Sequence, residues 1–378
     1  MATLGADEVR DALPDGSVLI EHLLVRGALL AWAVTPDGPV SARLTPTDDR
    51  AADELQRKLW TACQGRSPLW ERFAQQLGEL LLAPFDDAIG AAQHVILVPH
   101  RWGHLAPLHA LYWRGAPLIA ARTVSVLPSA SALRFLPRAA PPRGGPLLAV
   151  GDPTNMSRRR PGEAAATGGF GALPWSGAQA AEAVTWFAGS PAPLLGATAR
   201  EQAVRDGLAG ARVVHFATHG ILDEAPLLAC VVLAEGDTLD VWELLGLPLD
   251  ADLVTYSTCD SAGTPVTPGD EVVGLAWLTL AAGARAVVAS LWKVSELSTA
   301  VLMRAFYAGL RDGRPPHEAL AAAQQHVKGL TRATAAPEIA ALRAAAVAAG
   351  RPDPGAPDDV PADFSHPFHW AGFVLIGV

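Results

Sequence analysis

Cysteine is scarce in this chain: there are three in 378 residues, Cys63, Cys230 and Cys259, widely separated and without a CxxC pair. A small, odd set of this kind is a poor disulfide framework and a poor zinc site. Other short motifs are missing as well. The sequence has no GxxxxGK for phosphates, no HExxH for zinc, no GxSxG and no GxGxxG. These absences argue against several common classes of enzyme.

Long apolar runs and an excess of basic residues are also missing. No apolar run reaches the roughly 18 residues of a membrane span, and the opening MATLGADEVRDALPDG lacks the layout of a signal peptide. With 29 Lys and Arg against 38 Asp and Glu, the formal charge is -9, which argues against general binding of nucleic acid or anionic membranes. We therefore expect a soluble, cytoplasmic protein without a cofactor or a metal. The compact basic run at 158–160 is expected to be a solvated loop.

What the sequence does have is a hydrophobic half and a strand–helix rhythm. Hydrophobic residues make up 50% of the chain, enough for one large domain or about two. After residue 146, apolar strand-like segments alternate with amphipathic helical ones, which predicts an α/β fold with a mostly parallel sheet and helices on both faces. The segments expected to be strands are PLLAVGDP (146–153), RVVHFA (212–217), DLVTYST (252–258), RAVVASLW (285–292) and the final AGFVLIG.

The first part of the chain has its own pattern. Short alternating runs over 18–44 indicate a hairpin or small sheet, a helical stretch is expected over 48–82, and HVILVPH is typical of a buried strand. PRAAPPRGGP at 137–146 has the composition of a linker. Two further segments are set apart by their composition: a flexible loop is expected at 154–172, and an Ala/Pro-rich peripheral insertion before the last strand is expected at 331–363.

Two of the predicted strands end in reactive side chains. VVHFATHG leads to His219 and Gly220, and LVTYSTCDSAG leads to Cys259. Sites in open α/β sheets form outside the carboxyl ends of the strands, and a short connection would allow these two strands to lie side by side. An imidazole within reach of a thiol can take its proton, because a free thiol is only slightly ionised at neutral pH.

The same residues allow a simpler interpretation. A lone cysteine after an apolar strand is commonly a small buried hydrophobe, and a histidine at a strand end is commonly just hydrogen-bonded in place. We expect that simpler role for Cys63, Cys230 and the strand histidine His215. If His219 and Cys259 do act together, the backbone N–H groups of Gly220 and Cys259 could stabilise an oxyanion.

The segments taken together resemble the CHAT family of caspase-like proteins. The resemblance rests on ARVVHFATHG, on STCDS around the cysteine, on GDEVVGLAWLTLAAGARAVVASLWKV and on HPFHWAGFVLIG, in that order along the chain, with VPHRWGHLAPLHAL and VLPSASAL upstream. It implies a caspase-like fold with a pseudo-caspase N-terminal half (1–136), a linker (137–146) and a catalytic half (147–378). It also implies that His219 and Cys259 form a catalytic dyad, with Gly220 as an oxyanion donor. One departure is Ala262, which stands where the family often has Gly.

For the substrate the resemblance offers one candidate. LWKVSEL resembles a stretch of separase-like and CHAT proteases whose acidic residue lines the pocket for the residue before the cleaved bond, and Glu296 matches it. A carboxylate there would favour arginine or lysine. Alternatively, Glu296 is simply a first-turn helix residue favoured by the helix dipole. Asp270 and Glu271 are further candidates for the pocket.

Three functions follow as hypotheses. The first is a cysteine endopeptidase that cleaves a specific protein partner under the control of a separate sensor, with the resemblance suggesting a role in bacterial defence or programmed cell death. The second is a catalytically latent caspase-like interaction module. The third, a nucleotide-binding domain, has only the βα rhythm and the GDP at 151–153 in its favour, without a Gly-rich phosphate loop.

Overall fold

The computed structural model describes residues 3–136, 145–158, 167–221, 229–247, 249–260, 276, 278–355 and 360–378. For residues 158, 167, 168, 241, 259 and 260 the description covers the backbone. The predicted linker at 137–146 and the predicted loop at 154–172 therefore lie partly outside the described residues.

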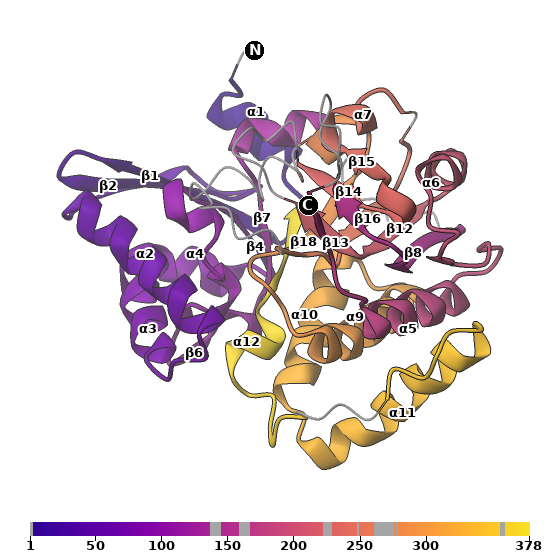
Figure 1. The fold of residues 1–378 in the computed structure, drawn as a ribbon. Coiled ribbons are helices and arrows are strands. Elements are labelled where there is room, and N and C mark those ends of the chain that lie inside the picture. Colours follow the sequence, from indigo (N-terminus) through magenta and orange to yellow (C-terminus); the bar gives the residue numbers. More distant parts are fainter. Residues whose placement is uncertain are drawn as a thin grey trace.

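A single large sheet runs through the described part of the chain (Figure 1). Its eleven strands follow the order β11 (Leu194–Gly196), β8 (Leu147–Pro153), β12 (Val213–Ala217), β16 (Leu253–Tyr256), β18 (Ala286–Ser290), β19 (Phe373–Gly377), β7 (Thr123–Val126), β4 (His94–Val98), β1 (Ser17–Val25), β2 (Ala28–Val34) and β3 (Ser41–Pro46). The five strands from β11 to β18 are parallel to one another, and so are the four from β19 to β1. The two blocks meet at β18 and β19, which are antiparallel. The carboxyl ends of the strands in one block therefore lie beside the amino ends of the other.

Helices cover both faces of this sheet, as the sequence predicts. On β8, Leu148 lies against Gly207 of α6 whereas Gly151 lies against α5, and side chains an odd number of positions apart on a strand point to opposite faces. Figure 1 shows α2, α3, α5, α9 and α10 below the sheet, with α11 outermost, and α1 and α6 above it. The helices are α1 (Ala6–Ala12), α2 (Asp49–Gln64), α3 (Trp70–Leu81), α4 (Asp86–Ala91), α5 (Pro174–Ala183), α6 (Glu201–Leu208), α7 (Val241–Leu244), α9 (Glu296–Arg311), α10 (Pro316–Lys328), α11 (Arg332–Ala348) and α12 (Pro367–Trp370).

Short strands lie outside the large sheet. β13 (His219–Ile221), β14 (Cys230–Val232), β15 (Thr238–Asp240) and β17 (Cys259–Asp260) form a small sheet that continues from the carboxyl ends of β12 and β16. The remaining pairs are β5 (Tyr112–Trp113) with β6 (Ala116–Pro117), and β9 (Ser157–Arg158) with β10 (Thr167–Gly169).

The local signals explain most of these elements. The continuous apolar runs of β4 and β8 are buried along their whole length, as expected of strands inside a parallel sheet. Ser295 caps α9 by accepting a hydrogen bond from the Ser298 N–H, and Pro316 opens α10.

One prediction about helices needs correction. The expected single helical stretch over 48–82 is two helices, because α2 ends at Gln64 with Gly65 as its C-cap, Arg66 has a φ of 54° and Pro68 cannot continue the helix. The 331–363 segment contains a 17-residue helix, α11, which packs against α5 and α9.

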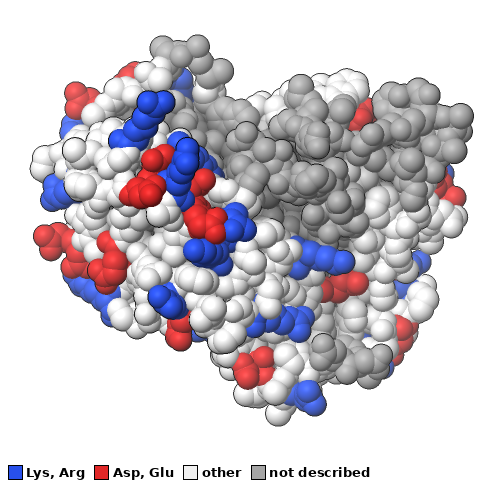
Figure 2. Space-filling model, turned by 60° about the vertical axis from the view of Figure 1, so that its left-hand side comes forward, with Lys and Arg blue, Asp and Glu red and all other residues white. Residues whose placement is uncertain are grey.

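Charged side chains do not separate by sign on the face of the N-terminal half. Figure 2 shows basic and acidic groups next to one another there. The ion pairs in this region include Arg57 with Glu54, Arg101 with Asp49 and Arg114 with Asp86. In the described residues, no helix is both long and apolar enough to cross a bilayer.

Close packing of α3 on the β5 backbone leads to a stability prediction. A Cβ added at Gly78 would lie 2.0 Å from the Tyr112 carbonyl oxygen. Gly→Ala in a helix ordinarily gains about 1 kcal/mol, but here we expect Gly78→Ala to lower the free energy of unfolding by about 1–3 kcal/mol through overpacking. Denaturant titration would measure it. The matched control is Gly90→Ala in α4, where the added Cβ would meet the end of the Arg114 side chain and stability should be unchanged or higher; equal effects of both substitutions would contradict the packing argument.

Candidate active site

The two residues singled out by the sequence lie on neighbouring strands. β12 pairs in parallel with β16, and the pairing continues beyond them into β13 and β17, where His219 is the Cα partner of Cys259 and Gly220 that of Asp260. The prediction that these strands lie side by side is therefore confirmed. The register brings the backbones of His219 and Cys259 together at the carboxyl ends of the parallel strands.

The imidazole of His219 is held by one of its nitrogens. Its Nε2–H donates to the carbonyl oxygen of Gly171 at 2.9 Å, and the ring of Phe170 packs against it with the centroids 5.1 Å apart. A carbonyl can only accept, so this bond fixes the tautomer. Nδ1 is buried and has no hydrogen-bond partner among the described residues. In the neutral ring, Nδ1 is therefore the nitrogen available to accept a proton.

The surroundings of His219 favour this neutral form. Burial lowers the pKa of His219 and the nearby Lys293 lowers it further, while the Gly171 carbonyl and Asp152 act in the opposite direction. The net shift is downward, so the imidazole is uncharged at neutral pH and can act as a base.

Asp152 is a residue of this site that the sequence reasoning missed. It lies at the carboxyl end of β8, is 5% exposed and has a φ of 42°, which is uncommon for a residue other than glycine. One carboxylate oxygen accepts from the Leu173 N–H at 2.8 Å, and the other accepts from Nη2 of Arg351, which follows α11. The signal was available, because Asp152 stands at a strand end as His219 and Cys259 do.

A short segment links these groups. Residues 170–176 provide the Phe170 ring and the Gly171 carbonyl for His219, and the Leu173 N–H for Asp152. The chain of contacts thus runs from Arg351 through Asp152 and the 170–176 segment to the histidine. No sequence pattern could reveal this, because the contacts on the segment are largely made by its backbone.

Glu296 lies against the same segment. It occupies the first turn of α9, and its carboxylate accepts from the Trp175 N–H at 3.3 Å, in the first turn of α5. Burial raises the pKa of Glu296 to about 7, with the nearby Asp152 adding to the rise. Glu296 is therefore more than a solvated first-turn residue, since it also meets the amino end of a second helix. The other pocket candidates, Asp270 and Glu271, lie outside the described residues.

Gly220 has a packing reason to be glycine. A Cβ at this position would lie 2.8 Å from Oγ1 of Thr258, the residue before Cys259. Its small size therefore allows β13 and the approach to Cys259 to lie close together.

The cysteines and the histidine that the sequence predicts to be structural are buried. Cys63 in α2 and Cys230 in β14 are buried, and burial raises the pKa of the Cys63 thiol. His215 is buried, with its Nδ1 in a 2.7 Å hydrogen bond with the Tyr307 hydroxyl. Across the described ranges, no cluster of three or more His, Cys, Asp or Glu is placed to hold a metal ion.

The pKa of Glu296 gives a pH-dependent prediction. Between pH 4.5 and about 7 the folded protein keeps a proton on Glu296 that the unfolded chain has released, so this residue makes the free energy of unfolding fall as pH rises through that window. We expect Glu296→Gln to remove this loss. The free energy of unfolding of the variant relative to wild type should therefore be greater at pH 8 than at pH 5, by on the order of 1–3 kcal/mol. Urea titrations at both pH values would measure this. The exposed acid Glu79, replaced by Gln, is the control, and parallel pH profiles for wild type and Glu296→Gln would disprove the assignment.

The comparisons with known proteins agree with this architecture. The CHAT domain family matches residues 71–378, so the chain belongs to the CHAT domain family. Among solved structures it is similar to separase in two Saccharomyces cerevisiae separase–securin complexes, with TM-scores of 0.56 and 0.52 and 10% identity in both. Each match covers 99% of this chain, but only 30% and 31% of the two matched chains. The fold is therefore caspase-like, as the sequence predicts.

Curated relatives share a smaller region. Tetratricopeptide repeat protein 28 from Homo sapiens is 26% identical over 229 residues, and the Mus musculus protein is 27% identical over 224. Each match covers 49% of this chain and 8% of the relative. The chain thus corresponds to a small part of these much longer proteins.

Proposed function

We propose that this chain is a cysteine endopeptidase with Cys259 as nucleophile and His219 as its proton-transfer partner. The observation that carries the proposal is the pairing of these residues across β13 and β17, with Nε2 of His219 held by the Gly171 carbonyl. A base oriented by a third group, beside a residue that can be a nucleophile, is the general arrangement of covalent catalysis.

The chemistry then proceeds in two halves. Nδ1 of His219 accepts the thiol proton, and the thiolate of Cys259 attacks the peptide carbonyl. His219 returns the proton to the leaving amine, and an acyl-enzyme remains. A water molecule, deprotonated by the same imidazole, hydrolyses the acyl-enzyme. The backbone N–H groups of Gly220 and Cys259 are the proposed donors to the oxyanion.

For the residue before the cleaved bond, we propose a basic side chain. Glu296 and Asp152 place two carboxylates beside the segment that holds His219, and a guanidinium would be favoured by such a site. Of the two carboxylates, Glu296 is the one proposed to pair with the basic side chain of the substrate, because Asp152 is already paired with Arg351. Asp270 and Glu271 are the other acidic residues proposed for this pocket.

Control by another protein is part of the proposal. An unregulated endopeptidase would be harmful inside a cell, and the separase of the similar structures is in complex with securin. We therefore propose that a separate sensor or inhibitor governs this chain, with a role in bacterial defence or cell-death signalling as the family resemblance suggests.

Covalent labelling tests the proposal directly. The purified chain would be treated with a peptidyl acyloxymethyl ketone ending in Arg, and with a matched probe ending in Leu, and the adduct read by intact mass. We expect one adduct on wild type, none on Cys259→Ala, a strongly slowed formation of the adduct on His219→Ala, and selective loss of the Arg adduct on Glu296→Ala. Cys63→Ala, which removes a buried thiol, is the matched control and should label as wild type does.

Two results would count against the proposal. Labelling that persists in Cys259→Ala would exclude this cysteine as the nucleophile. No labelling of wild type at high probe concentration would favour the alternative function, a catalytically latent interaction module.

A further inference from the structure

A pocket in the N-terminal half lies apart from the candidate active site. It has a volume of about 460 Å³ and is enclosed by α1, β1, β2 and the 3₁₀ helix Ala130–Phe135. Its walls are mainly apolar and include Val9, Leu19, Trp32 and Val34. A volume of this size suits a small ligand or one or two side chains of a partner.

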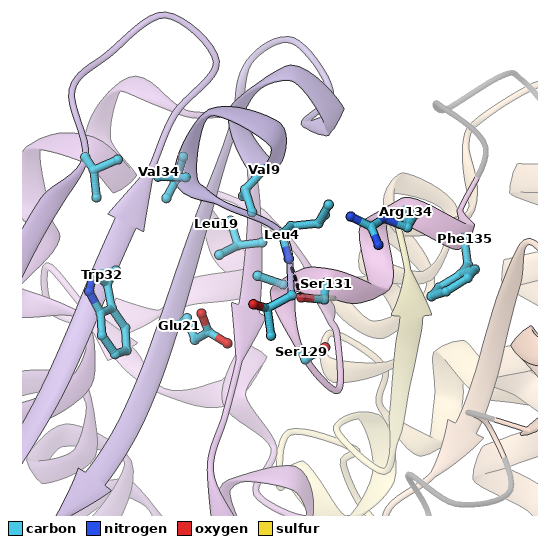
Figure 3. Close-up of a pocket in the computed structure, with 14 residues that line it drawn as sticks. Leu4, Val9, Leu19, Glu21, Trp32, Val34, Ser129, Ser131, Arg134 and Phe135 are labelled. Atoms are coloured by element: carbon cyan, nitrogen blue, oxygen red, sulfur yellow. Dashed lines mark hydrogen bonds between the residues drawn. The ribbon is translucent and has the colours of Figure 1, made fainter. Parts of the chain in front are cut away.

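A single carboxylate lines the wall of this pocket. Figure 3 shows Glu21 of β1 between Trp32 of β2 and the serines of the 129–131 turn, with Arg134 on the far side. Arg134 forms its ion pair with Glu8, at 3.5 Å, and no basic side chain in the described part of the chain pairs with Glu21. The backbone of Ala130 offers Glu21 one hydrogen bond, while burial raises the pKa of its carboxyl group. A partly buried carboxylate in an apolar pocket is stabilised by pairing with a cation, and most of all by one whose neighbouring groups are apolar and fill the rest of the pocket.

The apolar surface continues beyond the pocket. Cross-strand pairing aligns Glu21 with Trp32, and then Leu23 with Leu30 and Leu44, so these side chains share one face of the β1–β2–β3 sheet. Leu44 is 63% exposed. The opposite face is covered, since His22 bonds to the Leu81 carbonyl of α3. Partly exposed apolar residues in a row beside a pocket mark an interaction surface.

We propose that this pocket and the adjoining face of β1–β3 form a docking site for a partner protein, whose segment inserts an arginine or lysine flanked by apolar side chains against Glu21. The apolar walls receive the stem of the basic side chain and its neighbours, and the carboxylate receives the charged end. Charge complementarity selects this occupant, because a purely apolar segment would leave Glu21 buried without a counter-charge.

The site is independent of the proposed catalysis. The turn that carries Ser129 and Ser131 follows the carboxyl end of β7, and β7 runs opposite to β12 and β16, whose carboxyl ends hold the candidate dyad. The partner therefore does not compete with a substrate. Docking holds whether or not the chain is a protease.

Peptide binding tests the proposal with the full chain in a Cys259→Ala background, which prevents cleavage. The probe is acetyl-Leu-Ser-Arg-Leu-Ser-amide, compared with the same peptide carrying the uncharged isostere citrulline, by isothermal titration calorimetry. We expect the arginine peptide to bind about 10- to 100-fold more tightly. That preference should vanish in Glu21→Gln and persist in Glu79→Gln, and Trp32→Ala should weaken both peptides because it removes a wall of the pocket.

The remaining variants separate this site from the proposed substrate pocket. A preference that survives Glu21→Gln but is lost in Glu296→Gln would place the peptide in the substrate pocket and overturn the docking site. Equal binding of the two peptides, or no binding at millimolar concentration, would also overturn it. Self-association of wild type that Glu21→Gln abolishes would make a second copy the occupant instead of a basic segment. Circular dichroism of each variant confirms that it is folded.

Discussion

Replacing His219 with alanine is expected to lower the second-order rate of alkylation by the arginyl probe by about 10²–10⁴-fold at pH 7, the usual contribution of a general base. In wild type the rate should rise with pH to a plateau, and the midpoint of that rise should lie below the ordinary histidine pKa of 6.5, because burial lowers the pKa of His219. In His219→Ala the residual rate should instead keep rising toward the ordinary thiol pKa of about 8.5.

Stopped-flow or quenched labelling between pH 5 and 9 would measure both profiles. His326→Ala, which removes an exposed histidine paired with Glu338, is the matched control and should leave the profile unchanged. A His219→Ala variant with the rate and pH profile of wild type would rule out the proposed role of this imidazole.

The second large effect concerns Arg351. Arg351→Met leaves the carboxylate of Asp152, which is 5% exposed, without its cation, and breaking a pair of this kind costs about 3–5 kcal/mol of unfolding free energy. Because part of Arg351 is exposed, we expect about 2–4 kcal/mol. The variant should also label more slowly, since Asp152 holds the segment whose Gly171 carbonyl orients His219.

A double-mutant cycle isolates this interaction. Asp152→Asn with Arg351→Met should be less destabilised than the sum of the single substitutions, because neither charge is then left alone. Denaturant titration of the four proteins gives the coupling energy, and a value near zero would show that the pair is not energetically linked. Arg343→Met, which breaks the exposed pair with Asp353, is the control for a surface ion pair and should cost less than about 1 kcal/mol.

The sequence was informative where apolar runs are continuous. The strands β4, β8, β12, β16, β18 and β19 are all buried runs that needed no tertiary information to find, and the strand-end rule then placed His219 and Cys259 correctly at one end of the sheet. The division of the 48–82 stretch was missed, although Gly65 and Pro68 were signals of a break.

The rest depended on contacts between distant parts of the chain. Arg351 lies 199 residues from Asp152 in sequence, in an Ala/Pro-rich segment whose composition indicates only a surface position. The Gly171 carbonyl is a backbone atom, and every residue has one. In the sequence, Glu21 is the polar position of an alternating strand. Only the packing of α1 and the 3₁₀ helix Ala130–Phe135 shows that it lines a pocket.

The place of β19 in the sheet has a consequence for how the protein forms during synthesis. β19 follows every other strand in sequence, yet it lies between β18 and β7 and is the strand through which the two blocks are hydrogen-bonded. The ribosome synthesises the chain from its amino end, so the earlier strands are made before residues 373–377. The two blocks can be joined into one sheet only after these residues have been made. Pairing over such sequence separations is slow. An incomplete nascent chain therefore lacks the joined sheet, and the sheet's completion is a step that follows translation of its last strand.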